Sequence, residues 1–307
     1  MGGLGNQMFQ AAHALAHAMK LNREAVFVPR SWTPMQGRQT DNYLNNIFRN
    51  MKFVDNIDGF EKVSEGPWEY IDVYAKDHDT VFDGYFQSSK NFFGYYDEIR
   101  KIFSPTEEFV TEMYEKHPEL RQDNTLSIHI RRGDCFMNPD IHPIANEIYF
   151  ERALKEIGEY THVFVFTDDK DWAKENLKFE NVTYVDDEDY REMWLMSLCK
   201  NHIMVNSTFS WWGTFLNPNE NKKIVAFGAA AKGCIFLNSI NITNKEIEYI
   251  IDDTDIKQGK YMPGTGLKIL GREDVDIENI DYILILAHNF SDYIINSFKQ
   301  TYKGKFI

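Results

Sequence analysis

The amino-acid sequence predicts an α/β protein built on parallel sheets. From residue 125 onward, short apolar segments with strand character alternate with segments of helical periodicity, a pattern typical of a doubly wound sheet. The 307 residues are 43% hydrophobic and 15% aromatic, which is enough apolar material for the cores of about two domains. Polar and charged residues directly follow three of the expected strands, where open parallel sheets bind their ligands.

The first expected element is a helix that follows a glycine-rich turn. In "NQMFQAAHALAHAMK" (6–20), four apolar residues recur at helical spacing, namely Met8, Ala12, Leu15 and Met19. The turn "GGLGNQ" (2–7) permits close approach of the backbone to a ligand, because glycine has no side chain. A Gly-x-Gly pattern is weak evidence by itself, and the sequence shows no strand before it.

The segment from residue 40 to 122 is mixed in character and rich in aromatic and acidic residues. A helix is expected in "PTEEFVTEMYEKH" (105–117). Clustered charges and Pro118 then mark a boundary. We therefore expect one half of the fold to end near residue 122.

After this boundary, strands and helices alternate regularly. The expected strands are "TLSIHI" (125–130), "HVFVF" (162–166), "NVTYV" (181–185) and "HIMVN" (202–206). The expected helices are "YFERALKEIGEY" (149–160), "DWAKENLKF" (171–179), "EMWLMSLCK" (192–200) and "SWWGTFLN" (210–217). The first strand alternates apolar and polar residues, whereas the second is a continuous apolar run, as in a buried parallel strand.

Three strand ends carry the candidate ligand groups. They supply His129, Arg131, Arg132 and Asp134, then Thr167, Asp168 and Asp169, and finally Asn206, Ser207 and Thr208. Guanidinium groups offer a planar fork that fits phosphate oxygens, and the free N–H groups at the start of the last helix attract anions. Together these side chains predict a binding site for a ligand that has an anionic part and a polar part.

Each of these groups also has a purely structural interpretation. The arginines would form surface ion pairs, the hydroxyls would be ordinary helix caps, and at least one of the two aspartates would cap the next helix instead of binding a base or ribose. Of Trp211 and Trp212, one is expected to pack inward and the other to reach a ligand, because adjacent residues on a helix do not share a face.

Charge and cysteine content exclude several classes of protein. The formal net charge of −14, from 33 basic and 47 acidic residues, argues against nucleic acid or an anionic membrane as the main partner, since both require a basic face. Cys135, Cys199 and Cys234 lie far apart, so neither a disulfide framework nor a structural zinc site is expected. No apolar run approaches the roughly 20 residues of a membrane span. These features fit a cytoplasmic protein, with peripheral contact to the membrane as an alternative.

Four sequence blocks together resemble the α-1,2-fucosyltransferases of glycosyltransferase family 11. They lie within residues 1–222, in the family's order, and are "GGLGNQMFQ" (2–10), "GYFQSSKNF" (84–92), "HIRRGDC" (129–135) and "LMSLCKNHIMVNSTFSWWGTFLNP" (195–218). The resemblance implies a GT-B architecture, in which two Rossmann-like halves face each other across a cleft. It also implies GDP-fucose as the donor, the 2-hydroxyl of a galactosyl group on a glycan as the acceptor, inversion at the anomeric carbon, and no required metal or other cofactor.

The resemblance also assigns roles by position. Arg131 and Arg132 would stabilise the diphosphate leaving group as fixed donors aimed at developing charge. His129 and Asp134 would shape the same pocket, where Asp134 is a candidate base that two neighbouring cations weaken. The remaining donor-binding residues would be Ser207, Thr208 and Phe209 at phosphate, Glu192 at guanine or ribose, and Asn6 and Gln7 from the other half. Glu192 stands where the family more often has aspartate.

Three domains are expected. They are an acceptor-side half (1–122) that lacks the apolar strand usual before the glycine turn, a GDP-sugar-binding half (123–222), and a third module (223–307). The third module resembles the C-terminal domain of SAM-dependent sugar C-methyltransferases, in "KIVAFGAAAKGCIFLNSINI" (223–242), "EYIIDDTDIKQGKYMPGTGLKI" (248–269) and "DYILILAHNFSDYII" (281–295). This implies a short additional Rossmann-like α/β unit, cut short at "KGKFI".

The usual SAM-binding partner of that module is absent from the sequence, so we expect no methyl transfer. The alternative to a fucosyltransferase is a catalytically impaired chimera of two truncated modules that binds a nucleotide sugar. Transfer activity with a galactose-containing acceptor distinguishes the two hypotheses.

Overall fold

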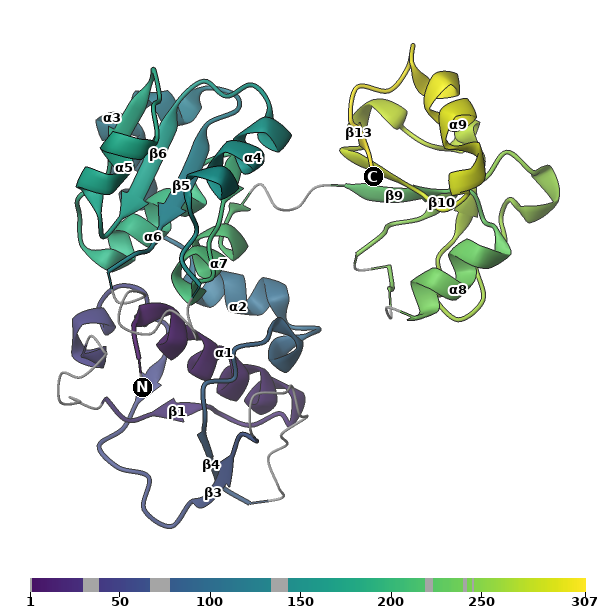
Figure 1. Ribbon diagram of the computed structural model, residues 1–307. Helices are drawn as coiled ribbons and strands as arrows, with labels where there is room; N and C mark the ends of the chain where they lie inside the picture. Colours follow the sequence, from purple (N-terminus) through teal and green to yellow (C-terminus); the bar gives the residue numbers. More distant parts are fainter. Residues whose placement is uncertain are drawn as a thin grey trace. The chain divides into compact units, whose positions relative to one another are not determined.

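The structure is a computed structural model that describes residues 2–29, 39–66, 78–133, 143–218, 223–239, 242–244 and 246–307. The chain divides into two compact units, Met1–Pro218 and Asn219–Ile307 (Figure 1). Every pairing between named strands is parallel in the described residues, which confirms the predicted parallel-sheet α/β class. Within these ranges, no helix is long and apolar enough to cross a membrane.

A four-stranded sheet forms the second half of the first unit. Its strands lie in the order β7-β6-β5-β8. Their bounds are Leu126–Ile130 (β5), Val163–Thr167 (β6), Val182–Tyr184 (β7) and Asn201–Ile203 (β8). Ile128 of β5 lies opposite Val165 of β6 on one side and Ile203 of β8 on the other. The four predicted strands are thus confirmed, with the apolar runs of β5 and β6 buried between two helical layers.

Helices cover both faces of this sheet. Their bounds are Glu147–Ile157 (α4), Lys170–Asn176 (α5), Asp189–Ser197 (α6) and Thr208–Phe215 (α7). Helices α4 and α5 pack in one buried cluster with Ile128 and Val165, whereas α6 and α7 pack in another with Phe164 and Phe166. This is the doubly wound arrangement that the alternating pattern predicts.

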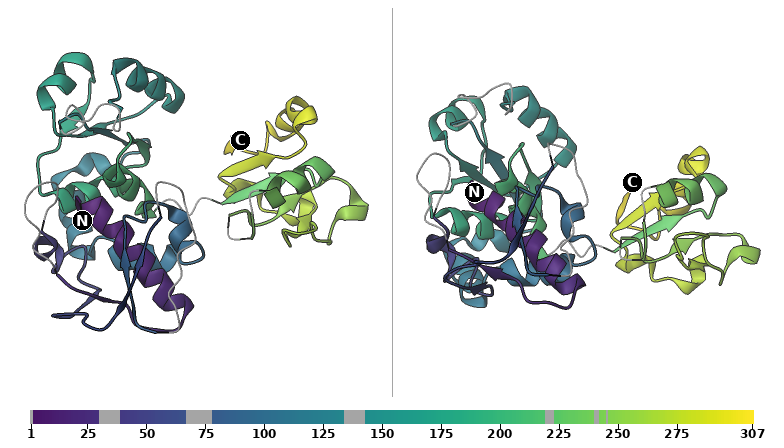
Figure 2. Two further views of the ribbon diagram at one scale, coloured as in Figure 1. Left: turned by 60° about the horizontal axis from the view of Figure 1, so that its bottom comes forward. Right: turned by 90° about the horizontal axis from the view of Figure 1, so that it is seen from below.

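The first half of the unit is organised around the N-terminal helix. The helices of this half are α1 (Leu4–Lys20), α2 (Tyr96–Phe103) and α3 (Glu107–Lys116). Both helices predicted here, at 6–20 and 105–117, are confirmed. Met8 of α1 and Phe103 of α2 lie in the same hydrophobic cluster as Trp212 of α7, and Figure 2 shows the purple helix α1 beside the green helices of the other half. The two halves of the first unit therefore share one core.

Two separate pairs of short strands accompany α1. Strand β1 (Val26–Phe27) pairs with β2 (Lys52–Phe53), and β3 (Glu61–Ser64) pairs with β4 (Thr80–Asp83). Short 3-10 helices lie at Thr40–Tyr43, Ser89–Phe92 and Pro118–Arg121. The sequence does not predict these strands, because two to four residues are too few to display a strand period.

The second unit contains a five-stranded parallel sheet in the order β11-β10-β9-β12-β13. The strands are Ile224–Phe227 (β9), Ile250–Ile251 (β10), Ile269–Leu270 (β11), Tyr282–Ile285 (β12) and Lys305–Phe306 (β13), and the helices are Ala231–Ser239 (α8) and Ser291–Phe298 (α9). Its 3-10 helices are Asp255–Lys257, Arg272–Asp274, Ile277–Asn279 and His288–Phe290. Buried clusters cover both faces of the sheet, so this unit is also a small doubly wound α/β fold.

Candidate functional site

The three polar strand ends lie side by side. Strand β5 pairs with β6 on one side and with β8 on the other, and all three are parallel. Their carboxyl ends therefore share one edge of the sheet, where Arg131, Asp168 and Ser207 follow β5, β6 and β8. The strand order reverses between β5 and β8, and such a switch point is where open α/β sheets form a ligand crevice.

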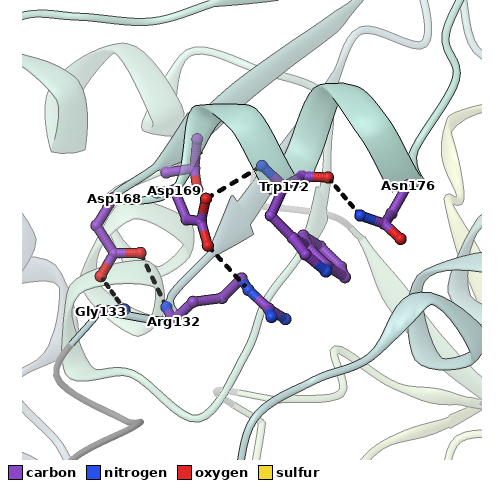
Figure 3. Close-up of polar contacts among 7 residues, drawn as sticks. Arg132, Gly133, Asp168, Asp169, Trp172 and Asn176 are labelled. Carbon is purple, nitrogen blue, oxygen red and sulfur yellow. Dashed lines mark hydrogen bonds and ion pairs between the residues drawn. The ribbon is translucent and has the colours of Figure 1, made fainter.

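The carboxylate of Asp168 accepts hydrogen bonds from the backbone of the loop that follows β5 (Figure 3). Its Oδ1 accepts a hydrogen bond of 2.8 Å from the backbone N–H of Arg132, and its Oδ2 accepts one of 3.0 Å from the N–H of Gly133. A Cβ at position 133 would lie 3.0 Å from Oδ2 of Asp168, so the close approach suits glycine. The carboxylate at the end of β6 thus fixes the backbone of the residues next to Arg131.

Arg132 is engaged on the β6 side of this loop. Its Nε lies 3.2 Å from Oδ2 of Asp169, its guanidinium carbon lies 3.9 Å from the ring centroid of Trp172, and its side chain is only 13% exposed (Figure 3). Asp169 also caps α5, because its Oδ1 accepts from the N–H of Trp172 at 3.1 Å. Asp169 is therefore the helix cap that the sequence predicts at the end of β6. Arg132 forms an ion pair with Asp169 and stacks on the ring of Trp172.

His129 is a neutral group beside the amino end of α7. Its ring centroid lies 5.3 Å from that of Phe209, and its Nδ1 is buried with no hydrogen-bond partner in the described residues. Burial, with a smaller contribution from the charge of Arg131, lowers the pKa of His129 to about 3. An imidazole with this pKa is uncharged at neutral pH and is a weak base.

The start of α7 contacts the start of α1. Ser207 caps α7 by accepting a hydrogen bond of 3.2 Å from the N–H of Phe209, so the helix-cap interpretation holds for this residue. The hydroxyl of Thr208 donates to Oδ1 of Asn6 at 2.8 Å, and Nε2 of Gln87 donates to the same oxygen at 2.8 Å. A Cβ at Gly5 would lie 2.6 Å from the carbonyl carbon of Thr208. Glycine at this position therefore allows the two helix ends to meet.

The other predicted residues make different contacts or lie outside the described ranges. Oε1 of Gln7 accepts from the hydroxyl of Thr40 at 3.1 Å. Glu192 lies in the first turn of α6, beyond the carboxyl end of β7, where its Oε1 accepts from the N–H of Asp187 at 3.2 Å. Burial raises the pKa of Glu192, and the bond from Asp187 opposes that shift. Asp134 lies outside the described residues.

The two tryptophans of "SWW" differ in burial, since Trp212 is a core residue and Trp211 is a half-buried residue that packs against the core. Trp212 is fully buried, and its Nε1 donates to the carbonyl oxygen of Gly5 at 2.9 Å. Trp211 stacks on Phe215, with centroids 4.9 Å apart, and lies 4.7 Å from the ring of Phe9. The expectation that one of the two packs inward is confirmed for Trp212, and the expectation that the other reaches a ligand stays a prediction for Trp211, which is half-buried.

Sequence reasoning missed one residue of the site, Gln87, and the role of another, Asp168. Gln87 joins the Asn6–Thr208 contact, and its only signal is its place in the block "GYFQSSKNF". Asp168 holds a loop backbone, whereas the sequence suggested a helix cap or a ligand contact. Residues from all four sequence blocks nevertheless lie in contact. Hydrogen bonds join Gln87, Asn6 and Thr208, which belong to three of the blocks. The ring of His129, from the remaining block, lies beside the ring of Phe209.

Comparison with known proteins finds family matches for both parts of the chain. Residues 1–239 match the profile described as "Glycosyl transferase family 11", and residues 216–307 match "C-methyltransferase C-terminal domain". An alpha-1,2-colitosyltransferase of Escherichia coli is 32% identical over 250 residues, which are 70% of this chain and 85% of the relative. The galactoside 2-alpha-L-fucosyltransferase of Caenorhabditis elegans is 25% identical over 249 residues, 71% of this chain and 68% of the relative.

Two further similarities are more limited. The C-methyltransferase NovU of Streptomyces niveus is 33% identical over 90 residues, which are 29% of this chain and 21% of the relative. The solved structure of NodZ alpha-1,6-fucosyltransferase soaked with GDP-fucose has a TM-score of 0.43 and 13% identity, over 71% of this chain and 90% of that chain. The likeness to NodZ is weak.

Proposed function

Because the chain belongs to glycosyl transferase family 11, we propose that it transfers L-fucose from GDP-fucose to the 2-hydroxyl of a galactosyl acceptor, with inversion and without a metal. Two relatives named for α-1,2 transfer of colitose and for galactoside 2-α-L-fucosyl transfer support the linkage. The observation that carries the proposal is that all four sequence blocks contribute to contiguous contacts around the β5–β8 switch point.

Arg131 is the proposed ligand of the diphosphate. Arg132 is committed to Asp169 and Trp172, so its role in this proposal is to position the loop. A guanidinium stays charged at physiological pH, and the amino end of α7 lies at the same sheet edge and attracts anions. Negative charge grows on GDP as the bond from the anomeric carbon to the diphosphate oxygen breaks, and these donors stabilise that charge.

The acceptor hydroxyl attacks the anomeric carbon from the face opposite GDP. One carbon–oxygen bond forms, the bond to the diphosphate breaks, and the hydroxyl proton passes to a base. His129 is a poor base, because its pKa is lowered to about 3. The base is not assigned, and Asp134 is a candidate for it on the ground of the sequence alone, weakened by two neighbouring arginines. Glu192, Ser207 and Phe209 remain proposed donor contacts.

The test is a transfer assay with the purified full chain. GDP-fucose and lactose are incubated with the protein, and GDP release and the mass of the product are measured. GDP-mannose replaces the donor in one control, and cellobiose, which has no galactose, replaces the acceptor in another. We expect a product only with GDP-fucose and lactose; absence of product in that reaction, at high enzyme concentration, rejects the proposal.

One observation favours a second candidate, which is nucleotide-sugar binding without turnover. Within the described ranges 2–29, 39–66 and 78–122, the first half of the unit forms two separate strand pairs, and an acceptor site built on these pairs alone would be incompletely supported. Isothermal titration of GDP-fucose separates the candidates. Saturable binding without product supports the second, whereas turnover eliminates it.

A further inference from the structure

Phe86 has an unusual backbone conformation. Its φ angle is 51°, in the left-handed region that bulky side chains rarely adopt. The other non-glycine residues with positive φ in the described chain are Asn22 and Asn124, and asparagine tolerates this region because its short side chain bonds locally. Strained residues persist only where the surrounding structure fixes them, and they cluster at functional sites. The turn around Phe86 is therefore a candidate functional element.

Contacts on all sides hold this turn. Oε2 of Glu65, which follows β3, accepts from the N–H of Tyr85 at 2.7 Å and from that of Phe86 at 2.9 Å. The carbonyl oxygen of Phe86 accepts from Nδ2 of Asn91 at 3.0 Å. The ring of Phe86 is buried and stacks on that of His13, with centroids 3.9 Å apart. The conformation is thus fixed through both the backbone and the side chain.

The loop after β5 is held in the same way. There, Asp168 at the end of β6 accepts from two successive backbone N–H groups, those of Arg132 and Gly133. In the first half, Glu65 at the end of β3 accepts from two successive N–H groups that follow β4. A Cβ at Gly84 would lie 2.4 Å from Cβ of Glu65, so glycine allows the carboxylate to approach. Each half of the unit therefore has one loop whose backbone is fixed by a carboxylate from the neighbouring strand, as expected of rigid supports for a site.

The turn places Gln87 next to the candidate anion site. Gln87 is exposed, and its Nε2 donates to Oδ1 of Asn6 at 2.8 Å. That oxygen also accepts from Thr208, in the first turn of α7, so both of its lone pairs are used. Oε1 of Gln87 and Nδ2 of Asn6 have no partner in the described residues. One acceptor and one donor group on the first half are therefore available, one side chain away from α7.

These two groups match neighbouring hydroxyl groups of a sugar. A hydroxyl both donates and accepts hydrogen bonds. Because Oε1 of Gln87 and Nδ2 of Asn6 are each one carbon atom away from the hydrogen bond that joins the two side chains, adjacent hydroxyls of one sugar ring can reach both. A phosphate has only acceptor oxygens at neutral pH, and Oε1 of Gln87 would repel it. The chemistry of the pair therefore favours a saccharide over the diphosphate.

We propose that Gln87 and Asn6 bind two adjacent hydroxyl groups of the acceptor saccharide, and that the turn at Phe86 holds Gln87 in position for this contact. The inference rests on the proposed transfer reaction and adds acceptor contacts to it. In that reaction the diphosphate binds at the amino end of α7, and the acceptor approaches the anomeric carbon from the opposite side. Gln87 and Asn6 belong to the first half and adjoin α7 through Thr208, as this approach requires.

Lactose binding to the full chain saturated with GDP is the direct test, because it requires no turnover. Gln87→Met keeps the length of the side chain and removes its amide. We expect this variant to bind lactose about three- to tenfold more weakly in an NMR saturation-transfer titration, as for the loss of one hydrogen bond. Its affinity for GDP-fucose, measured by isothermal titration, should be unchanged. Gln122→Met changes another exposed glutamine and should alter neither affinity.

The outcomes separate this inference from the proposed reaction. Unchanged lactose affinity in Gln87→Met overturns the inference, and an equal loss of affinity for GDP-fucose also overturns it, because Gln87 would then belong to the donor site. Absence of lactose binding by the wild type rejects the inference as well. If the wild type binds lactose through Gln87 but transfers no fucose, only the proposed reaction fails.

A second variant tests the support of the turn. Glu65→Ala removes the acceptor of two N–H groups, so it should weaken lactose binding and speed amide exchange at Tyr85 and Phe86. Because Glu65 acts through Gln87 in this proposal, adding Glu65→Ala to Gln87→Met should cause no further loss of lactose affinity. A further loss would show that the turn does not act by positioning Gln87. If Glu65→Ala fails to fold, Gln87→Met, which changes an exposed position, decides.

Discussion

The hydroxyl of Thr208 donates a hydrogen bond of 2.8 Å to Oδ1 of Asn6, across 202 residues of sequence. The contact joins the first turn of α7, next to the candidate anion site, to the first turn of α1. Because Gln87 donates to the same oxygen, Asn6 connects three of the four sequence blocks. The site is therefore assembled by tertiary contacts between short motifs.

We expect a double-mutant cycle to detect this contact. Thr208→Val keeps the side-chain shape and removes the donor, and Asn6→Ala removes the acceptor. The coupling in the free energy of unfolding should be about 0.5–1.5 kcal/mol, the usual net contribution of one hydrogen bond. Urea unfolding of the wild type, both single variants and the double variant measures it, and strictly additive losses would show that the bond contributes nothing.

Replacement of Arg131 by alanine should reduce kcat/KM for fucose transfer by about 100- to 1000-fold, because a fixed donor to the leaving group is lost. Steady-state kinetics with GDP-fucose and lactose measure the change. Arg152→Ala removes an exposed arginine on α4 and serves as the control, which should keep full activity. Wild-type turnover in the Arg131 variant would remove this residue from the mechanism.

Asp168→Asn should also lower activity, by about 10- to 100-fold, since hydrogen bonds to a charged group contribute about 1.5–3 kcal/mol. An asparagine keeps one acceptor oxygen, but its NH₂ group faces a backbone N–H of the loop. The loss should appear in kcat and be accompanied by faster amide exchange at Arg132 and Gly133. Slower turnover with unchanged exchange would indicate that Asp168 acts on the substrate and not through the loop.

Stability of the first unit should fall as the pH is lowered below about 6.5. Burial lowers the pKa of His13 and His129 to about 3 and that of His202 to about 4, whereas the unfolded chain has ordinary histidine values. Between these limits the unfolded state binds more protons, so each histidine costs up to about 1.4 kcal/mol per pH unit. Stability from this source is present above pH 6.5 and is lost on acidification.

Urea unfolding at pH 7 and pH 5 measures that loss. The variant His129→Phe keeps an aromatic ring against Phe209 and has no titrating group, so its loss between the two pH values should be smaller than that of the wild type. An identical loss would assign the acid sensitivity to other groups.

The sequence predicted the second half of the first unit well, because its strands carry their own periodicity. The alternation of "TLSIHI" and the apolar run "HVFVF" each specify a strand, and the polar residues after them mark the edge. Strands β1 and β10 have two residues each, so they are defined only by their neighbours. Local patterns cannot reveal elements of that length.

The roles of the two arginines show a different limit. "RR" at a strand end left two interpretations open, phosphate ligands or surface ion pairs, and Arg132 is stacked on Trp172 and paired with Asp169. The identity of the partners on α5 depends on which helix packs beside β6, which only the tertiary structure supplies.

The hydrophobic cluster that contains Met8, Phe103 and Trp212 is continuous across both halves of the first unit. A hinge motion that separated the two halves would expose that cluster to water, at a large cost in free energy. Substrates must then reach the sheet edge while the two halves stay docked. We therefore expect small-angle X-ray scattering of the protein to show no change in the dimensions of this unit when GDP-fucose is added.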